Sequence, residues 1–215
     1  MVNMSVPRAP GRLCVLLCSL CLLPSFPQHQ PHHSAEDYAR FLEDPTRDVW
    51  QKPDKVVKTL KLSRTEAVAD IGAGTGYFAR RIARKAAKVY AVDIDPQLLE
   101  TAKQNAPANL EMIHSSPDDP KLPPQSVDTI FFCAVLHHIE RRPAYYAKLD
   151  KALKPGGRIV IIDFYKRPTP VGPPLEMKLS EEEVAAELKA AGFALTKSHG
   201  FLPHQYFLVF RRNAE

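Results

Sequence analysis

The chain has 215 residues, of which 45% are hydrophobic and 25% are charged, so it is long enough for one domain with a full core. Its formal net charge is +5, and Arg8 and Arg12 supply two of these charges in a first segment without Asp or Glu. The remaining charge of about +3 is too small to indicate nucleic-acid binding by itself. Residues 35–215 contain one cysteine, Cys133, which excludes a disulfide framework.

Residues 1–34 differ in composition from the rest of the chain. Two arginines precede an apolar run, residues 13–23, which would span about half of a ~30 Å hydrocarbon core as a helix. This order is typical of a signal peptide. We therefore expect residues 1–34 to be a leader and linker that exports the protein or attaches it to a membrane. An uncleaved anchor, or an inert extension of a cytoplasmic protein, stays open.

From residue 35 onward the pattern is that of one α/β domain, residues 35–215. A helical approach segment, with a helix near 54–60, comes first. Strands are then expected at 67–71, 88–92, 110–114, 127–133, 158–163, 194–198 and 206–210. Helices are expected at 76–86, 96–105, 143–153 and 181–191. This alternation predicts a mainly parallel sheet with helices on both faces, closed by an antiparallel C-terminal strand.

A glycine turn follows the first expected strand. The strand ends at Asp70, and Gly72, Gly74 and Gly76 then alternate with other residues before a helix. Such a turn brings the backbone close to a polar ligand. A dinucleotide fingerprint would need glycine at 77, where the chain has Tyr77. The acid directly before the turn suits a cofactor with a cationic amine better than one with a pyrophosphate.

A second acid, Asp93, ends the second strand about twenty residues after the first glycine, where a carboxylate can accept hydrogen bonds from ribose hydroxyls. The two acids and the glycine turn together resemble the class I S-adenosylmethionine-dependent methyltransferases. The resemblance implies a Rossmann-like, seven-stranded sheet that binds S-adenosylmethionine. Ile94 would pack on the adenine face, and Asp118, or else Asp119, would meet the adenine amino group. The implied cofactor-binding residues are Asp70, Gly72, Ala73, Gly74, Gly76, Asp93, Ile94 and Asp118.

Two adjacent histidines, His137 and His138, follow the fourth strand at the edge where open α/β sheets bind ligands. Imidazole accepts a proton near neutral pH, so both are candidate catalytic residues. The Leu-His-His-Ile segment is similar to that of small-molecule methyltransferases of the quinone-biosynthesis type. Successive strand residues point to opposite faces, so one histidine should matter more than the other. Only the family resemblance favours His137. A structural pair stays open. No metal site is expected, because adjacent residues rarely share one metal and no third ligand is evident.

The resemblance extends over about residues 48–211 and is similar to small bacterial methyltransferase-like proteins with leader peptides. It implies transfer of a methyl group from S-adenosylmethionine to a small-molecule or lipid-like acceptor. The alternative is a non-catalytic protein that binds S-adenosylmethionine or S-adenosylhomocysteine. Tyr77 and the lack of a Tyr-x-x-x-Lys pair disfavour a nicotinamide oxidoreductase. Because S-adenosylmethionine is made inside cells, an exported enzyme would need a supply of it.

Overall fold

The computed structural model describes Met1, residues 34–104 and residues 106–213. The predicted leader therefore lies outside the described residues, apart from its first and last positions. Three short helices come first in the described chain: α1 (Ala35–Leu42), α2 (Arg47–Gln51) and α3 (Pro53–Leu60). No helix within the described ranges combines the length and the apolar character that a membrane crossing requires.

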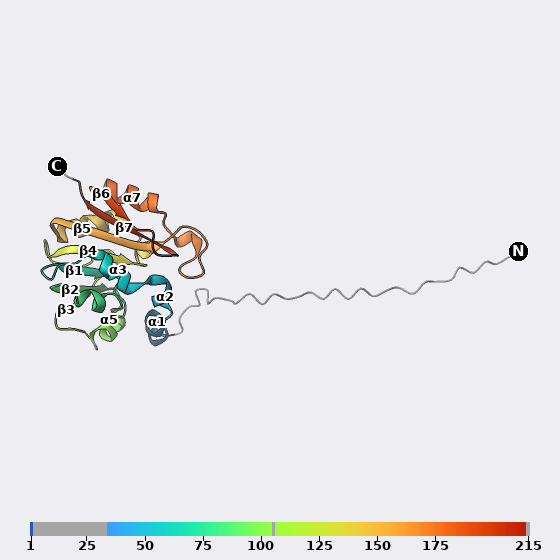
Figure 1. Cartoon of the computed structure of the whole chain (residues 1–215), viewed down its shortest axis with the longest axis horizontal. Coiled ribbons are helices and arrows are strands. Elements are labelled where there is room, and N and C mark those ends of the chain that lie inside the picture. The colour runs from blue at the N-terminus through green and yellow to red at the C-terminus, as the bar shows by residue number, and fades with distance from the viewer. Residues whose placement is uncertain (2–33, 105, 214–215) are drawn as a thin grey trace.

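One sheet of seven strands organises the described part of the chain (Figure 1). Its strand order is β3-β2-β1-β4-β5-β7-β6, and β7 runs antiparallel to both of its neighbours. The expected fold, a mainly parallel seven-stranded sheet with one reversed C-terminal strand, is thereby confirmed. The strands are β1 (Ala67–Ile71), β2 (Lys88–Asp93), β3 (Leu110–His114), β4 (Val127–Cys133), β5 (Leu153–Phe164), β6 (Phe193–Ser198) and β7 (Gln205–Arg212).

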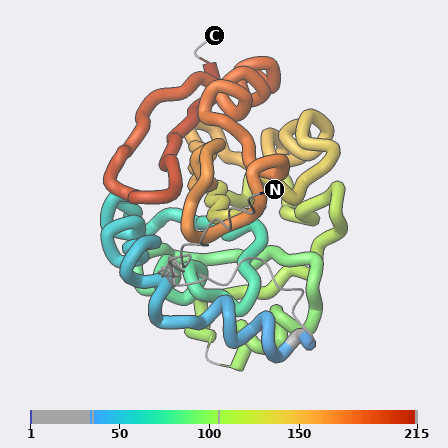
Figure 2. Tube along the Cα trace, turned by 90° about the vertical axis from the view of Figure 1, so that its right-hand side faces the viewer, coloured from blue at the N-terminus to red at the C-terminus, as the bar shows by residue number. Residues whose placement is uncertain are grey.

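Helices cover both faces of the sheet, because successive strand residues point to opposite sides. In β4, Ile130 joins a core cluster with residues of α6 and α7, whereas Phe131 joins a second cluster with residues of α3, α4 and α5. Figures 1 and 2 show how the chain passes through these layers. The later helices are α4 (Ala79–Ala83), α5 (Pro96–Lys103), α6 (Arg142–Ala152) and α7 (Glu181–Ala190), with 3-10 turns η1 (Leu136–His138) and η2 (Leu175–Met177).

Several element boundaries differ from the sequence prediction by a few residues, and two of these differences have a clear physical reason. Helix α4 begins at residue 79 rather than 76, because Gly76 has φ +84°, which a right-handed helix excludes. Strand β5 begins at Leu153 rather than 158, because Leu153 already pairs with Val127 of β4 ahead of the turn glycines. Helix α6 correspondingly ends one residue before its expected end.

Candidate active site

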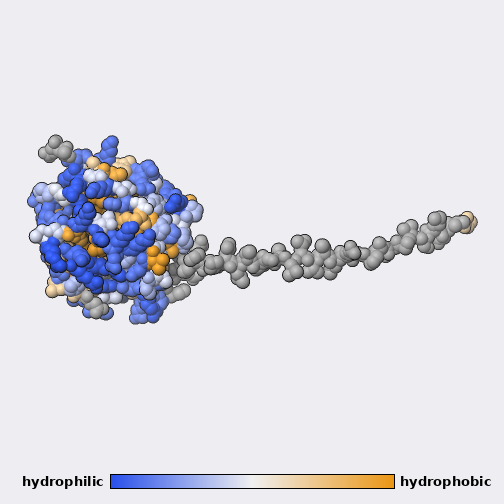
Figure 3. Space-filling model, in the orientation of Figure 1, coloured by the Kyte–Doolittle hydropathy of each residue, from blue (hydrophilic) through white to orange (hydrophobic). Residues whose placement is uncertain are grey.

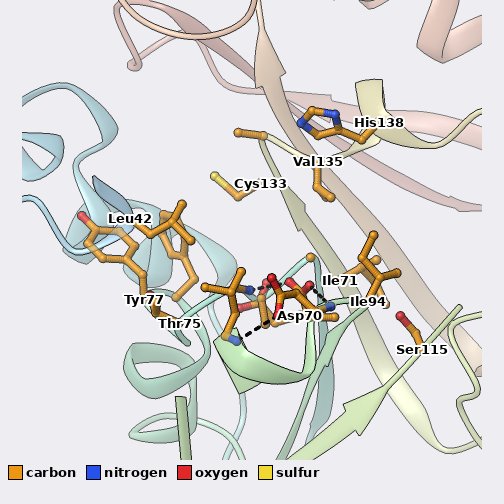
Figure 4. A pocket seen from close by; sticks show the side chains of 18 of the residues that line it. Leu42, Asp70, Ile71, Thr75, Tyr77, Ile94, Ser115, Cys133, Val135 and His138 are labelled. Carbon is orange, nitrogen blue, oxygen red and sulfur yellow. Dashed lines mark hydrogen bonds between the residues drawn. The ribbon is translucent and has the colours of Figure 1, made fainter. Parts of the chain in front are cut away.

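A pocket of about 520 Å³ lies at the carboxyl ends of β1, β2 and β4 (Figure 4). This is the edge at which open α/β sheets bind ligands. The glycine turn, the end of β2, the turn after β3 and the segment after β4 form its walls, and residues of the N-terminal helices complete it. The predicted site residues that line it are Asp70, Gly72, Ala73, Gly74, Asp93, Ile94 and His138.

The glycine turn owes its shape to backbone conformations that favour glycine. Gly72 and Gly74 have φ +68° and +53°. A Cβ on Gly72 would lie 2.3 Å from Cγ2 of Val135, so the two walls of the pocket approach each other only because this side chain is missing. Gly76 does not line the pocket. A Cβ on Gly76 would lie 3.2 Å from Cβ of Ala102 in α5, so its role is close packing rather than ligand contact.

The backbone amides of this turn are bound within the protein. The N–H groups of Gly72 and Ala73 donate to the carbonyl oxygen of Val92, at 2.8 and 3.1 Å. The N–H of Gly74 donates to Oδ2 of Asp93 at 2.7 Å. The turn therefore joins β1 to the end of β2 and brings the two acidic strand ends to one pocket.

Asp70 is the most perturbed acid of the pocket. It is only 3% exposed, and its Oδ2 has no hydrogen-bond partner among the described residues. Burial, and secondly the charge of Asp93, raise the pKa of Asp70 to about 8, against the opposing effect of a hydrogen bond from the backbone of Ala79. A buried, unpaired carboxylate oxygen at a pocket wall is costly by itself and is stabilised when a cation binds beside it.

Asp93 is held in place by two backbone amides. Oδ2 accepts from Gly74, and Oδ1 accepts from the N–H of Asp95 at 2.9 Å. Burial raises the pKa of Asp93, and these hydrogen bonds act in the opposite direction. A carboxylate has about four acceptor sites, so two remain for ligand hydroxyls. The next residue, Ile94, is 57% exposed at the pocket wall, a position open to an apolar ring.

Asp118 was expected to meet the adenine amino group, and that contact stays a prediction. Asp118 does not line the pocket, because its carboxylate pairs with Arg141 and accepts a hydrogen bond from Oγ of Ser116 at 3.0 Å. Its alternative, Asp119, pairs with Lys148 at 2.8 Å and also lies outside the pocket. The turn after β3 still reaches the pocket, through Ser115, Ser116 and Pro117.

The two histidines lie on a 3-10 turn, not on a strand, so the expected alternation of strand faces does not apply. Strand β4 ends at Cys133, and Ala134 then reverses the chain with φ +58°. His138 lines the pocket, whereas His137 is buried with Nδ1 2.9 Å from Oδ1 of Asp163. Their rings lie 4.2 Å apart. His138 is thus the histidine that lines the pocket, and a catalytic role for either histidine stays a prediction.

Sequence reasoning missed the part of the pocket that the N-terminal helices provide. Tyr38, Leu42 and Arg47 line it from this side. Directly after α1, Glu43 accepts a hydrogen bond from Oγ1 of Thr75 at 2.5 Å, which fastens the helix to the glycine turn. The helical spacing of Tyr38 and Leu42 is a signal for one buried face, but it does not indicate which surface that face covers.

Cys133 and Tyr145 also line the pocket. The Cys133 thiol is buried and accepts a hydrogen bond from Nε2 of Gln51 at 3.1 Å, and burial raises its pKa well above the ordinary value. Cys133 therefore forms part of the wall, and its raised pKa disfavours the thiolate that a nucleophilic role would need. Within the described ranges, no group of three or more His, Cys, Asp or Glu side chains is arranged to hold a metal ion.

The fold, the glycine turn and the two acidic strand ends define a class I S-adenosylmethionine-dependent methyltransferase domain. Residues 69–161 match the model of the family described as "Methyltransferase domain". A solved S-adenosylmethionine-dependent methyltransferase from Aquifex aeolicus is 27% identical, with a TM-score of 0.75 over 82% of this chain and 97% of that one. The unpaired oxygen of Asp70 and the amide-bound carboxylate of Asp93 fit this cofactor, which carries an amine and a ribose.

Two curated relatives each match about half of the chain. An uncharacterised methyltransferase of Mycobacterium bovis is 35% identical over 101 residues, 46% of this chain and 51% of that protein. A demethylmenaquinone methyltransferase of Tropheryma whipplei is 33% identical over 109 residues, 50% of this chain and 45% of that protein. The chain thus spans about half the length of these relatives.

Proposed function

We propose that the protein transfers the methyl group of S-adenosylmethionine to a small-molecule or lipid-like acceptor. The observation that carries the proposal is the buried Oδ2 of Asp70, which has no partner in the described chain and lines the pocket beside Asp93. An ammonium group bound there would satisfy the carboxylate. The place suits a pyrophosphate poorly, because Asp70 and Asp93 offer it no positive charge.

Each wall of the pocket has a distinct part in holding the cofactor. Asp70 pairs with the cationic amine, and Asp93 accepts hydrogen bonds from the ribose hydroxyls. Ile94 covers one adenine face, and the turn at Ser116 and Pro117 borders the adenine edge. When bound, S-adenosylmethionine supplies a methyl group on an activated sulfonium leaving group.

The chain then contributes mainly alignment, because the transfer is an in-line displacement. Effective molarities of ~10⁵–10⁸ M are available to well-oriented reactants. Proton removal from the acceptor is the second task, and His138 is the pocket residue suited to it. Asp163 holds His137, and the His137 ring packs against His138, so these two residues position the proton acceptor.

The walls near His138 are mostly apolar, which favours an acceptor with an apolar body. Cys133, Val135 and Ile139 line this side. The demethylmenaquinone methyltransferase among the relatives is consistent with a small, apolar acceptor.

The second candidate function is binding of S-adenosylmethionine or S-adenosylhomocysteine without transfer. Asp70 and Asp93 would bind the cofactor in either case, so they do not distinguish methyl transfer from binding alone. A measurement of turnover does.

Two measurements test the proposal in order. Calorimetry with S-adenosylhomocysteine should show binding, and binding of a nicotinamide dinucleotide in its place would refute the cofactor assignment. The protein is then incubated with methyl-labelled S-adenosylmethionine and a metabolite extract. Label in a small organic product supports the enzyme, whereas binding without any transfer supports the second candidate.

Substitution of the histidines tests the proton acceptor once a product is known. His138→Gln should lower turnover by roughly 10²–10⁴ and leave the affinity for S-adenosylhomocysteine unchanged. His204→Gln is the matched control, because His204 contacts Trp50 and does not line the pocket. Full activity of His138→Gln between pH 6 and 9 would remove His138 from the mechanism.

We also propose that residues 1–34 export the protein or attach it to a membrane. The support is the basic and apolar order of that segment. Fractionation of cells should find the full chain with the membrane or outside the cytosol, and a chain starting at Ala35 inside the cytosol. Recovery of both in the cytosol would contradict the proposal.

A further inference from the structure

A second cavity, of about 840 Å³, lies on the α3 side of the sheet, and none of its lining residues lines the cofactor pocket. Helix α3 forms one wall, and β6, the edge strand, contributes to the other. Val160 of β5 and Val209 of β7 line the floor between them. We call this cavity the basic groove, because its charged residues are almost all cations.

The charge of the basic groove is as large as that of the whole chain. Six lining residues are lysines or arginines and one, Asp54, is acidic, which leaves +5, the formal net charge of all 215 residues. Figure 3 shows that hydrophilic residues (blue) cover much of the face seen there, with smaller hydrophobic areas (orange) among them. The cations are Lys55, Lys58, Lys61, Arg158, Lys197 and Arg211.

Acidic side chains of the protein neutralise little of this charge. Arg158 pairs with Glu66 at 3.2 Å, but no other cation of the basic groove has an ion pair with an acid of the described residues. His199 lines the groove too, and its pKa is lowered by burial and then by the charges of Lys197 and Lys61. Cations from both walls therefore act on the same imidazole. Like charges gathered with so few counter-charges indicate a site for an anion.

The shape and the aromatic residues narrow down the kind of anion. The cations line a hollow, whereas a flat bilayer surface would need them on a protruding face. Single-stranded nucleic acid uses exposed aromatic rings as stacking platforms. Here Phe207 is buried, and the Phe201 ring beside the groove is covered by Nζ of Lys55 at 4.6 Å. The volume lies in the range of small-ligand sites.

We propose that the basic groove binds a small ligand with two or more linked phosphates. Lys58 and Lys61 of the α3 wall and Lys197 of the β6 wall would contact the phosphate chain from both sides, and Arg211 would contact it from β7. Ammonium and guanidinium groups make short, charge-assisted hydrogen bonds to phosphate oxygens. The ligand comes from one of two sources, inorganic polyphosphate or a nucleoside polyphosphate, which share this chemistry.

The test is calorimetry with inorganic triphosphate, at low and at moderate salt, with S-adenosylhomocysteine present at saturation to fill the cofactor pocket. Lys58→Glu/Lys197→Glu changes one exposed lysine in each wall. It should bind triphosphate about tenfold more weakly or worse, because two charge-assisted contacts become repulsive. The imidazole signals of His199 should shift in NMR spectra when triphosphate is added to the wild type.

The matched control is Lys151→Glu/Lys189→Glu, which makes the same change of net charge at exposed lysines in the last turns of α6 and α7. This variant should bind triphosphate like the wild type. Equal weakening of triphosphate binding in both variants would show a general effect of net charge and would contradict the proposed site. A thermal melt of each variant shows whether it is folded.

The same titration with a nucleoside triphosphate distinguishes the two sources. Tighter binding than that of inorganic triphosphate assigns the groove to nucleotides, and equal or weaker binding assigns it to inorganic polyphosphate. The proposal is overturned if the wild type binds neither probe. It is also overturned if a single-stranded RNA oligonucleotide, or vesicles with anionic lipid, bind more tightly than either probe and lose binding in the Lys58→Glu/Lys197→Glu variant.

Discussion

The affinity for S-adenosylhomocysteine should rise steeply between pH 6 and 8, because Asp70 must lose a proton before it can pair with the cationic amine. Its pKa in the cofactor-free protein is raised to about 8 by burial and by Asp93. The ionised fraction then rises about fiftyfold between these two pH values, and the association constant should follow it. At pH 7, binding should release about 0.9 proton per site, because that fraction of Asp70 is protonated beforehand.

Calorimetry in two buffers of different ionisation enthalpy measures the association constant at each pH and the number of protons that binding releases. Asp70→Asn removes the titrating group and little else, because the amide oxygen can still accept the hydrogen bond from the backbone of Ala79. It should bind S-adenosylhomocysteine weakly and without this pH dependence. Methylthioadenosine, which lacks the amine, should bind the wild type equally at pH 6 and 8. A flat wild-type profile, or the same slope in Asp70→Asn, would refute the assignment of the proton to Asp70.

The same pKa has a consequence for stability. Because the folded-state pKa of Asp70 lies above the ordinary value of 3.8, the unfolded chain loses this proton first. Stability therefore falls as the pH rises from about 4 to about 8. Without cofactor, Asp70→Asn should melt at a higher temperature than the wild type at pH 8, and the difference should be smaller at pH 5.

Two further predictions concern the packing around the site. Gly72→Ala should abolish binding of S-adenosylhomocysteine and lower stability by about 1–3 kcal/mol, since its Cβ would lie 2.3 Å from Val135 at φ +68°. Gly200→Ala, whose Cβ would meet nothing within 4 Å, is the control and should leave both unchanged. Glu187→Gln should lower the free energy of unfolding at pH 7 by about 1–3 kcal/mol, because Glu187 binds Arg142 through two contacts of 2.8 Å. Arg142 holds the pKa of Glu187 below its ordinary value, so denaturant titrations should show this difference shrinking as the pH falls below about 4.5.

The features that sequence could predict are those that short stretches of chain determine. The turn at Gly72 and Gly74 needs positive φ values, and the following Asp93 is brought to the turn by the strand pairing that any parallel βαβ unit makes. All seven strands were expected within a few residues, because short apolar, β-rich runs alternate with helical ones. The late start predicted for β5 was wrong because the pairing of Leu153 depends on β4.

The features that escaped prediction depend on partners far along the chain. His137 is buried because Asp163, at the end of another strand, accepts its hydrogen bond. Asp118 lies outside the pocket lining, where its carboxylate pairs with Arg141, which follows β4. The residues next to His137 and His138 do not indicate which of the two is buried. Those next to Asp118 do not indicate whether its side chain contacts the adenine. Choosing between them requires the positions of side chains that the tertiary fold brings together.

The place of β7 in the sheet bears on how the protein can be made. Residues 205–212 lie between β5 and β6, so one edge of β5 has no partner until that segment has been synthesised. Strand β5 is rich in isoleucine and valine, and such an edge is a template for aggregation. A nascent chain that stalls before Gln205 would expose this edge. We expect ribosome-bound chains of that length to need a chaperone, and full-length chains to be released from it.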